Sequence, residues 1–206
     1  MQDEAFEPVL RQMVAGRPRI DLRAAAGAVR RTGVRRPTLL DVGCGSGYYT
    51  RVFSHLIERP VRYTGVDFSR PMIARGRALD PLRRLVVGDG MALPFADDSF
   101  DIVFSGTSLM HMPRYERAVR EAQRTARRWC IFHTIPVLER RPTTFLRHQA
   151  YGGPMVELVF NAGELMSVFA NAGLTPRDRL PSIPYNLDAV LGETTRTWTF
   201  VCEVNA

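Results

Sequence analysis

The sequence lacks lysine altogether, has only three cysteines and contains no long apolar run. Cys44, Cys130 and Cys202 are widely spaced and odd in number, so we expect neither a disulfide framework nor a CxxC metal site. No stretch approaches the roughly 20 apolar residues that span a membrane, and the opening MQDEAFEPVL lacks the basic start and apolar stretch of a signal peptide. These absences predict a cytoplasmic protein without membrane association.

Basic charge is carried by arginine alone. All 28 basic residues are arginines, against 21 acidic residues, which gives a formal net charge of +7. The arginines are spread along the chain, with local runs at residues 30–36 and 114–128, and lack the regularly interleaved aromatic residues of a base-stacking platform. This distribution favours solvated helix faces, and it leaves an anionic partner open as the alternative.

Length and composition predict one globular domain in which short apolar runs alternate with helical segments. The chain has 206 residues, of which 45% are hydrophobic and 24% charged. The alternation predicts an α/β fold with a doubly wound, mostly parallel, Rossmann-like sheet and helices on both faces. Strands are expected at residues 38–42, 62–67, 85–87, 100–105 and 129–134, and helices at 47–59, 69–79 and 113–128.

The remaining segments divide the chain around this core, residues 38–134. Residues 1–37 predict an N-terminal helical cap over the substrate, with one or two helices interrupted by AGRPRID. Residues 135–160, which contain prolines and a Gly-Gly-Pro, predict an irregular excursion that covers the substrate. Residues 161–206 predict a final helix and a pair of strands.

Local signals set the expected ends of that last segment. Asn161 can cap the start of a helix and Gly173 can stop it. Residues 177–187 and 195–204 predict two strands, and the short connection between them favours an antiparallel pairing.

The segment LLDVGCGSGYYT, residues 39–50, places three glycines between a buried strand and a helix. Gly43, Gly45 and Gly47 allow a tight turn in which a ligand can touch the main chain. The pattern is GxGxG, and Tyr48 stands where a dinucleotide-binding GxGxxG loop has its third glycine. This departure disfavours a dinucleotide site.

Acidic residues stand at the ends of three successive strands, where ligands of such sheets bind. Asp41 precedes the glycine loop. Asp67 ends the second strand, where its carboxylate can reach the two hydroxyls of a ribose. Asp89 follows the third strand and can accept a hydrogen bond from an adenine amine, with Met91 against the ring. The pattern predicts a ligand that contains a nucleoside.

The motifs LLDVGCGSG, GVDFSRPMI, GDGMALPFADDSFDIVFSG and SLMHM fall within residues 39–134. In this combination the chain resembles a class I S-adenosylmethionine-dependent methyltransferase of the small-molecule type. The resemblance implies a seven-stranded sheet with the last strand antiparallel, S-adenosylmethionine as cofactor, S-adenosylhomocysteine as product and no metal. One departure is EAQRTARRW, which lacks the Pro-Gly-Gly that many relatives carry, so we expect this helix to run directly into the strand at Trp129.

The resemblance also implies where the cofactor would lie. The methionine end would lie against the glycine loop, the ribose on Asp67 and the adenine beside Asp89, while Ser105 and Gly106 would flank the sulfonium. The full set of expected cofactor-binding residues is Asp41, Gly43, Cys44, Gly45, Gly47, Tyr48, Asp67, Phe68, Met72, Asp89, Gly90, Met91, Ser105 and Gly106.

Methyl transfer from a sulfonium is an in-line displacement, so positioning can supply most of the acceleration. A base is needed only when the acceptor is a hydroxyl or a poorly acidic carbon. His111 and His133 are the candidates, because His111 follows the fourth strand and His133 lies at the end of the fifth. His148 and Tyr151 are candidate substrate contacts. A structural role is the alternative for each of the four.

The predicted function is methyl transfer to O, N or C of a small-molecule metabolite, with the acceptor and the oligomeric state left open. Two alternatives remain: a non-catalytic, cofactor-binding regulatory subunit, and an RNA methyltransferase, which would need a contiguous arginine surface beside the cofactor. Specific DNA methylation is not expected, because the chain lacks an Asn-Pro-Pro-Tyr-like motif and a Pro-Cys nucleophile. The four histidines lack the spacing of a zinc site.

Overall fold

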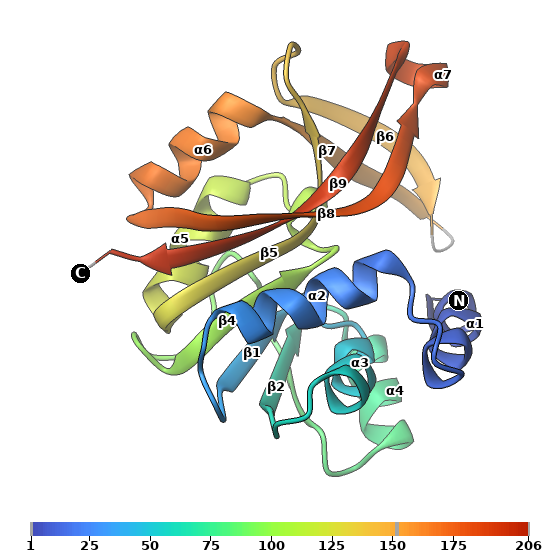
Figure 1. The fold of residues 1–206 in the computed structure, drawn as a ribbon, viewed down its shortest axis with the longest axis vertical. Helices are drawn as coiled ribbons and strands as arrows, with labels where there is room; N and C mark the ends of the chain where they lie inside the picture. Colours follow the sequence, from blue (N-terminus) through green and yellow to red (C-terminus); the bar gives the residue numbers. More distant parts are fainter. Residues whose placement is uncertain (1, 151–152, 206) are drawn as a thin grey trace.

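The computed structural model describes residues 2–150 and 153–205, and Figure 1 shows a central sheet with helices on both sides. The helices are α1 (Gln2–Val14), α2 (Ile20–Arg31), α3 (Tyr48–Leu56), α4 (Arg70–Leu79), α5 (Tyr115–Thr125), α6 (Ala162–Asn171) and α7 (Asp188–Leu191), with a 3-10 turn η1 (Leu109–His111). The strands are β1 (Thr38–Val42), β2 (Arg62–Asp67), β3 (Arg84–Val87), β4 (Phe100–Gly106), β5 (Ala126–Leu138), β6 (Thr144–Ala150), β7 (Gly153–Asn161), β8 (Leu174–Leu187) and β9 (Glu193–Val204).

The five strands of the predicted core are parallel, in the order β3-β2-β1-β4-β5. The last strand, β9, runs antiparallel to β5, and β8 runs antiparallel to β9. The predicted class is therefore confirmed: a mostly parallel α/β sheet that ends in an antiparallel strand. Because the core strands are parallel, their carboxyl ends share one edge, the carboxyl edge.

Residues 135–160 do not form an irregular excursion, and that prediction was wrong. β5 continues to Leu138, and β6 and β7 form an antiparallel hairpin that raises the number of strands from the expected seven to nine. β7 also joins β5 in parallel at Val137 and Phe160. Pro136 was misleading: it follows a break in the β5–β9 register between Phe132 and Ile135, where a strand tolerates proline.

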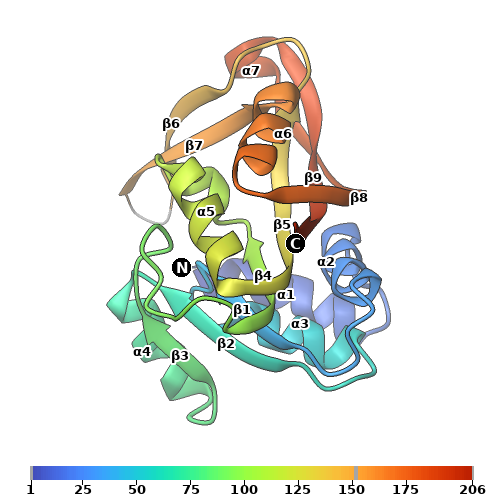
Figure 2. The same cartoon turned by 90° about the vertical axis from the view of Figure 1, so that its left-hand side faces the viewer.

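Two layers of helices lie on opposite faces of the central strands (Figure 2), and alternate residues of these strands pack against different layers. Leu39 and Ile131 pack with side chains of α1, α2 and α3, whereas Leu40 and Phe132 pack with α5 and α6. All four are at most 1% exposed. The central strands β1, β4 and β5 are thus buried on both faces, which explains why they are mostly apolar runs without polar alternation.

Short-range signals set several element ends. Asn161 accepts the N–H of Glu164 at 3.1 Å, and Gly173, with a φ of +72°, follows the helix that Asn161 caps. α5 runs directly into β5, as expected, although the strand begins at Ala126 and not at Trp129. Among the described residues, no helix has the length and apolar character that crossing a membrane requires.

Candidate functional site

The loop between β1 and α3 carries glycine at every second position from 43 to 47. Gly43, Gly45 and Gly47 have φ angles of +75°, +56° and +84°, which residues with a Cβ rarely adopt. The N–H groups of Gly43 and Cys44 donate to the carbonyl of Val66 at 2.8 and 3.1 Å. The loop therefore folds onto the end of β2, at the carboxyl edge.

The carboxylate of Asp67, the last residue of β2, is hydrogen-bonded to this loop. Oδ2 accepts the N–H of Gly45 and Oδ1 accepts the N–H of Ser69, both at 2.8 Å. A carboxylate oxygen has two lone pairs, so each oxygen can still accept a hydrogen bond from a ligand hydroxyl. The residue expected to hold a ribose thus also fixes the position of the glycine loop.

Asp41 is fully buried in β1, and only one of its oxygens is satisfied. Tyr63 donates its hydroxyl to Oδ2 at 2.5 Å, whereas Oδ1 is buried without a hydrogen-bond partner in the part of the chain that the structure describes. Burial, together with the nearby charge of Asp67, raises the pKa of this carboxyl to about 7, although the hydrogen bond from Tyr63 acts in the opposite direction. A buried oxygen without a donor marks a place where a ligand cation or N–H can bind.

Phe68 and Asp89 follow β2 and β3 at the same edge. Phe68 is 82% exposed, which is unusual for a large apolar side chain. Asp89 accepts the N–H of Met91 at 2.8 Å, so it fixes the turn after β3. Met72 and Met91 are half-buried. The expected adenine position thus has apolar side chains and a carboxylate beside it.

Ser108 joins the ends of β4 and β1, and the sequence analysis missed it. Its hydroxyl donates to the carbonyl of Val42 at 2.6 Å, so in the 2.8 Å contact between the two hydroxyls Ser105 is the donor. A methyl group on Gly43 would come within 2.4 Å of Ser108 Cβ, so glycine is needed there for space as well as for φ. Two serines three residues apart after a buried strand were the available signal.

The side chains of Cys44 and Tyr48 lie against the protein. Cys44 packs with Ile73 and Leu85, and burial raises the pKa of its thiol. Tyr48 packs on Phe6 of α1, with ring centroids 4.6 Å apart. For these two residues, the expected cofactor contact is a contact of the backbone.

The backbone at Gly90 and Gly106 lies too close to its neighbours for any side chain. An added Cβ would come within 2.8 Å of Met112 Cε at Gly90 and within 2.4 Å of Tyr49 Cε2 at Gly106. Both glycines follow or end strands of the carboxyl edge. Packing therefore requires glycine at position 106, whereas at position 90 a side chain would have to displace the flexible end of Met112 and Val42 Cγ1.

His111 connects the end of β4 to the β6–β7 hairpin. Its Nδ1 lies 2.9 Å from the carbonyl of Val156, and because a carbonyl only accepts, Nδ1 carries the proton. In the neutral ring, Nε2 then carries the lone pair, which is the form that a general base needs. His111 is half-buried, so its ring reaches the surface at this edge.

His133 lies deeper, and it is fully buried in β5. Its Nδ1 lies 2.6 Å from Thr199 Oγ1, its ring stacks on Phe104, and Nε2 has no hydrogen-bond partner in the described part of the chain. Burial lowers the pKa of His133 to about 4, so the ring is neutral at physiological pH. The sequence could not distinguish this buried histidine from the half-buried His111.

Thr107 and Thr134 are held in a strained conformation. Both are β-branched, yet both have a φ of +58°, in the left-handed region. Their hydroxyls lie 2.6 Å apart, and Thr134 also donates to the carbonyl of His133 at 2.7 Å. Such strain persists only where the surrounding structure imposes it, and it collects at functional sites.

Asp21 and Arg19 form an ion pair where α2 begins. Asp21 is 4% exposed, and Arg19 donates to its two oxygens at 2.8 and 2.5 Å. The other end of α2 leads to the start of β1, so this end lies toward the carboxyl edge. Electrostatic effects of Asp21 on the pKa values of His133 and Tyr49 agree with that position.

The two candidate substrate contacts cannot be placed. His148 belongs to β6, but its side chain lies outside the described part of the structure, and Tyr151 lies outside the described residues. Within residues 2–150 and 153–205, no group of three or more His, Cys, Asp or Glu side chains is placed to hold a metal ion.

The fold and the groups at its carboxyl edge define an α/β domain suited to a nucleoside-containing ligand. Residues 40–132 match the family model described as a methyltransferase domain. This part of the chain is therefore similar to a methyltransferase domain.

Among curated proteins, the demethylmenaquinone methyltransferase of Staphylococcus aureus strain JH9 is 41% identical over 96 residues. That alignment covers 45% of this chain and only 40% of the relative's length.

Similar solved structures share the fold at low sequence identity. A SAM-dependent methyltransferase from Methanosarcina mazei has a TM-score of 0.67 at 14% identity, covering 86% of this chain and 96% of that one. The [4+2]-cyclase SpnF has a TM-score of 0.65 at 17% identity, covering 90% and 81%. Because one of these is named a cyclase, function has to be argued from the site.

Proposed function

We propose that this chain transfers the methyl group of S-adenosylmethionine to an O, N or C atom of a small-molecule metabolite, with S-adenosylhomocysteine as the product. The observation that carries the proposal is the set of ligand-binding groups at the carboxyl edge: the bare glycine loop, Asp67 tied to Gly45, and the unsatisfied Oδ1 of Asp41. The name of the Staphylococcus aureus relative supports a small-molecule acceptor.

The residues at this edge suit S-adenosylmethionine group by group. Asp41 Oδ1 would accept from the ammonium of the methionine end, the remaining lone pairs of Asp67 would accept from the ribose hydroxyls, and Phe68 would cover the adenine. The cofactor supplies an electrophilic methyl group on its sulfonium. The chain then has to hold the acceptor in line with that methyl and keep water away.

Thr107 is our candidate for orienting the acceptor. Thr134 gives its hydroxyl proton to the carbonyl of His133, so in the 2.6 Å contact Thr107 donates to Thr134. The Oγ1 of Thr107 has two lone pairs, so beside its hydrogen bond with Tyr49 it can still accept one hydrogen bond at the exposed end of β4. An O–H or N–H bound there would direct its lone pair away from Thr107.

His111 suits the role of general base better than His133. His111 is half-buried, and its Nε2 carries the lone pair of the neutral ring. His133 is 0% exposed behind Phe104 and Tyr49, and it contacts Thr134 only through its backbone carbonyl. In this proposal, residues 1–37 and 135–160 cover the acceptor, since α2 brings Asp21 to this edge and β7 binds His111.

The same observations give less support to the two alternatives, a non-catalytic regulatory subunit and an RNA methyltransferase. The polar groups of His111, Thr107 and Asp21 give the acceptor side the chemistry that a non-catalytic subunit would lack. A groove lined by several arginines lies at the amino ends of the strands, away from the cofactor edge where an RNA methyltransferase would need it.

Calorimetric titration with S-adenosylmethionine and S-adenosylhomocysteine tests the proposal. We expect micromolar dissociation constants, about −8 kcal/mol. Transfer of labelled methyl groups to a panel of small metabolites, with total RNA in parallel, then separates the alternatives. Failure of both compounds to bind would overturn the proposal, and labelling of RNA alone would replace the small-molecule acceptor.

Protonation of Asp41 should make cofactor affinity depend on pH. The raised pKa, about 7, keeps this carboxyl largely protonated at pH 6, so binding an ammonium there first costs a proton. We expect affinity for S-adenosylmethionine to rise about tenfold between pH 6 and pH 8. In the protein without cofactor, a rise in pH has the opposite effect on folding stability. The stability that Asp41 contributes is lost as pH rises from 3.8 to about 7, because the folded protein holds the proton more tightly than the unfolded chain.

Calorimetry across that pH range checks this prediction, with Asp41→Asn as the control because an amide does not titrate. The variant should bind more weakly and show a flatter profile. Parallel profiles in the two proteins would assign the pH dependence to another group.

A further inference from the structure

A groove of about 740 Å³ lies at the amino ends of β2 and β3, the opposite edge of the sheet from the proposed methyl-transfer site. This volume is that of a typical small-molecule pocket. Arg62, Thr64, Arg84, Phe95, Ser99 and Phe100 are among its lining residues. The six residues of β2 place Arg62 about 16 Å from Asp67 at the strand rise of about 3.3 Å per residue.

The register of the sheet brings the two arginines together on one face. Thr64 lies directly beside Arg84 in the β2–β3 pairing, and Arg62 precedes Thr64 by two residues. Side chains two apart on a strand share a face, so Arg62, Thr64 and Arg84 form one basic row. Arg62 and Arg84 are thus diagonal neighbours across the two strands, and an anion bound between them would offset the repulsion of their like charges.

No carboxylate of the described chain neutralises this pair. Arg62 and Arg84 are exposed and make no ion pair in residues 2–150 and 153–205, although Arg83 beside them pairs with Asp80 at 3.3 Å. A guanidinium matches the oxygens of a phosphate in charge and geometry. Thr64 lines the same groove and has a hydroxyl that can donate, whereas the hydroxyl of Ser99 gives its proton to the carbonyl of Ala96 at 2.6 Å.

The sheet face at this groove is open because no helix follows β3. The chain between Val87 and Phe100 is a loop. The next helix, α5, packs on β4 and β5 and does not cover β2 and β3. Phe95 of this loop meets Phe100 edge to face, with ring centroids 5.1 Å apart, and both side chains line the groove. The groove thus has an apolar wall beside its basic row.

We infer that this groove binds a phosphorylated small molecule, with the phosphate on Arg62 and Arg84 and the apolar part of the ligand against Phe95 and Phe100. This site is separate from the proposed cofactor site and goes beyond the proposed function. A concave groove with an apolar wall favours a small organic phosphate over the backbone of a nucleic acid, which needs an extended basic track.

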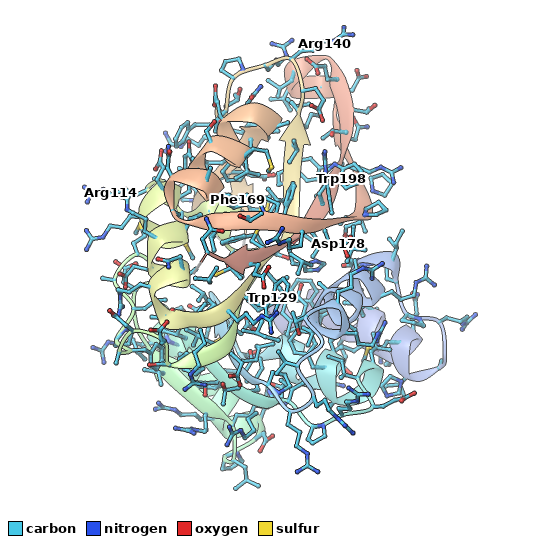
Figure 3. All side chains as sticks on the ribbon, turned by 60° about the vertical axis from the view of Figure 1, so that its left-hand side comes forward. Arg114, Trp129, Arg140, Phe169, Asp178 and Trp198 are labelled. Carbon is cyan, nitrogen blue, oxygen red and sulfur yellow. The ribbon has the colours of Figure 1, made fainter. Side chains whose placement is uncertain are left out.

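The test uses inorganic pyrophosphate and phenyl phosphate as probes, in calorimetric titrations at low salt with S-adenosylhomocysteine present to fill the cofactor site. We expect both to bind, and Arg62→Gln/Arg84→Gln to weaken binding at least about tenfold. The matched control is Arg114→Gln/Arg120→Gln, which removes the same charge from two exposed positions, Arg114 directly before α5 and Arg120 within it; Figure 3 shows Arg114 projecting outward. The control should bind the probes within about twofold of the wild type.

Three results would overturn the inference: no binding of either probe, equal losses in the two double variants, or binding of an oligouridylate but of neither probe. The first removes the site, the second indicates diffuse surface charge, and the third replaces the small phosphate with RNA. Affinity for S-adenosylmethionine, measured in the same variants, should be unchanged, so failure of this inference and failure of the proposed function are separate outcomes.

Discussion

Asp67→Ala should weaken S-adenosylmethionine binding by at least about 100-fold, because one carboxylate has two tasks. Its free lone pairs are the proposed ribose ligands, and its present hydrogen bonds hold Gly45 and Ser69 at 2.8 Å. Removing it leaves two backbone N–H groups without a partner and frees a loop whose glycines have no intrinsic preference for the bound conformation. Calorimetry on the purified variant measures the loss directly.

Two controls separate ligand contact from general damage. Asp178→Ala removes a carboxylate that pairs with Arg31 across β8 and α2, distant from the glycine loop, and should leave cofactor affinity unchanged; Figure 3 labels Asp178. The melting temperature of Asp67→Ala shows whether the variant is folded at the temperature of the titration. A folded Asp67→Ala protein that binds the cofactor within about threefold of the wild type would contradict the ribose assignment.

The parts of the site that local sequence encodes were predictable. The strand ending at Val42, the three glycines and the carboxylate of Asp67 lie within short motifs, and a parallel sheet brings successive strand ends to one edge whatever the details of packing. The hydrogen bond between Gly45 and Asp67 likewise joins segments that follow or end adjacent strands. The residues that the resemblance assigned to the cofactor accordingly lie along this edge.

The acceptor side was not predictable, because it depends on contacts between distant parts of the chain. Thr107 and Thr134 are 27 residues apart, and nothing in either segment signals a left-handed β-branched residue. His111 owes its tautomer to the carbonyl of Val156, 45 residues away. His133 lies at a strand end in the sequence, and only the packing of Phe104 and Tyr49 around its ring makes it buried and neutral.

The hairpin of β6 and β7 was also not predictable from local sequence. Prolines and a Gly-Gly-Pro indicated irregular chain, but Pro136 lies just after a register break and the apolar run at residues 158–160 is fully buried. Burial of that run against β5 outweighs the local turn signals. Tertiary context therefore decided this segment, and it is the segment that supplies the partner of His111.

Gly106→Ala should destabilise the protein by about 1–3 kcal/mol and lower its melting temperature by about 2–4 °C for each kcal/mol. The added methyl would lie 2.4 Å from the ring of Tyr49 and 2.5 Å from that of Phe104. Both rings are buried, and Tyr49 also meets the rings of Phe53 and His133, so neither can withdraw. The overlap would also shift the end of β4, where the sulfonium is proposed to lie, and so reduce cofactor affinity.

Gly27→Ala is the matched control, because it makes the same change inside α2. A methyl there meets only flexible arginine ends at 3.5 Å or more, and replacing a helical glycine with alanine stabilises by up to about 1 kcal/mol. Thermal unfolding of both variants should therefore give shifts of opposite sign. A Gly106→Ala protein that melts at or above the wild-type temperature would mean that the ring cluster under β4 repacks, and that Gly106 is required neither for space nor for the shape of the proposed cofactor site.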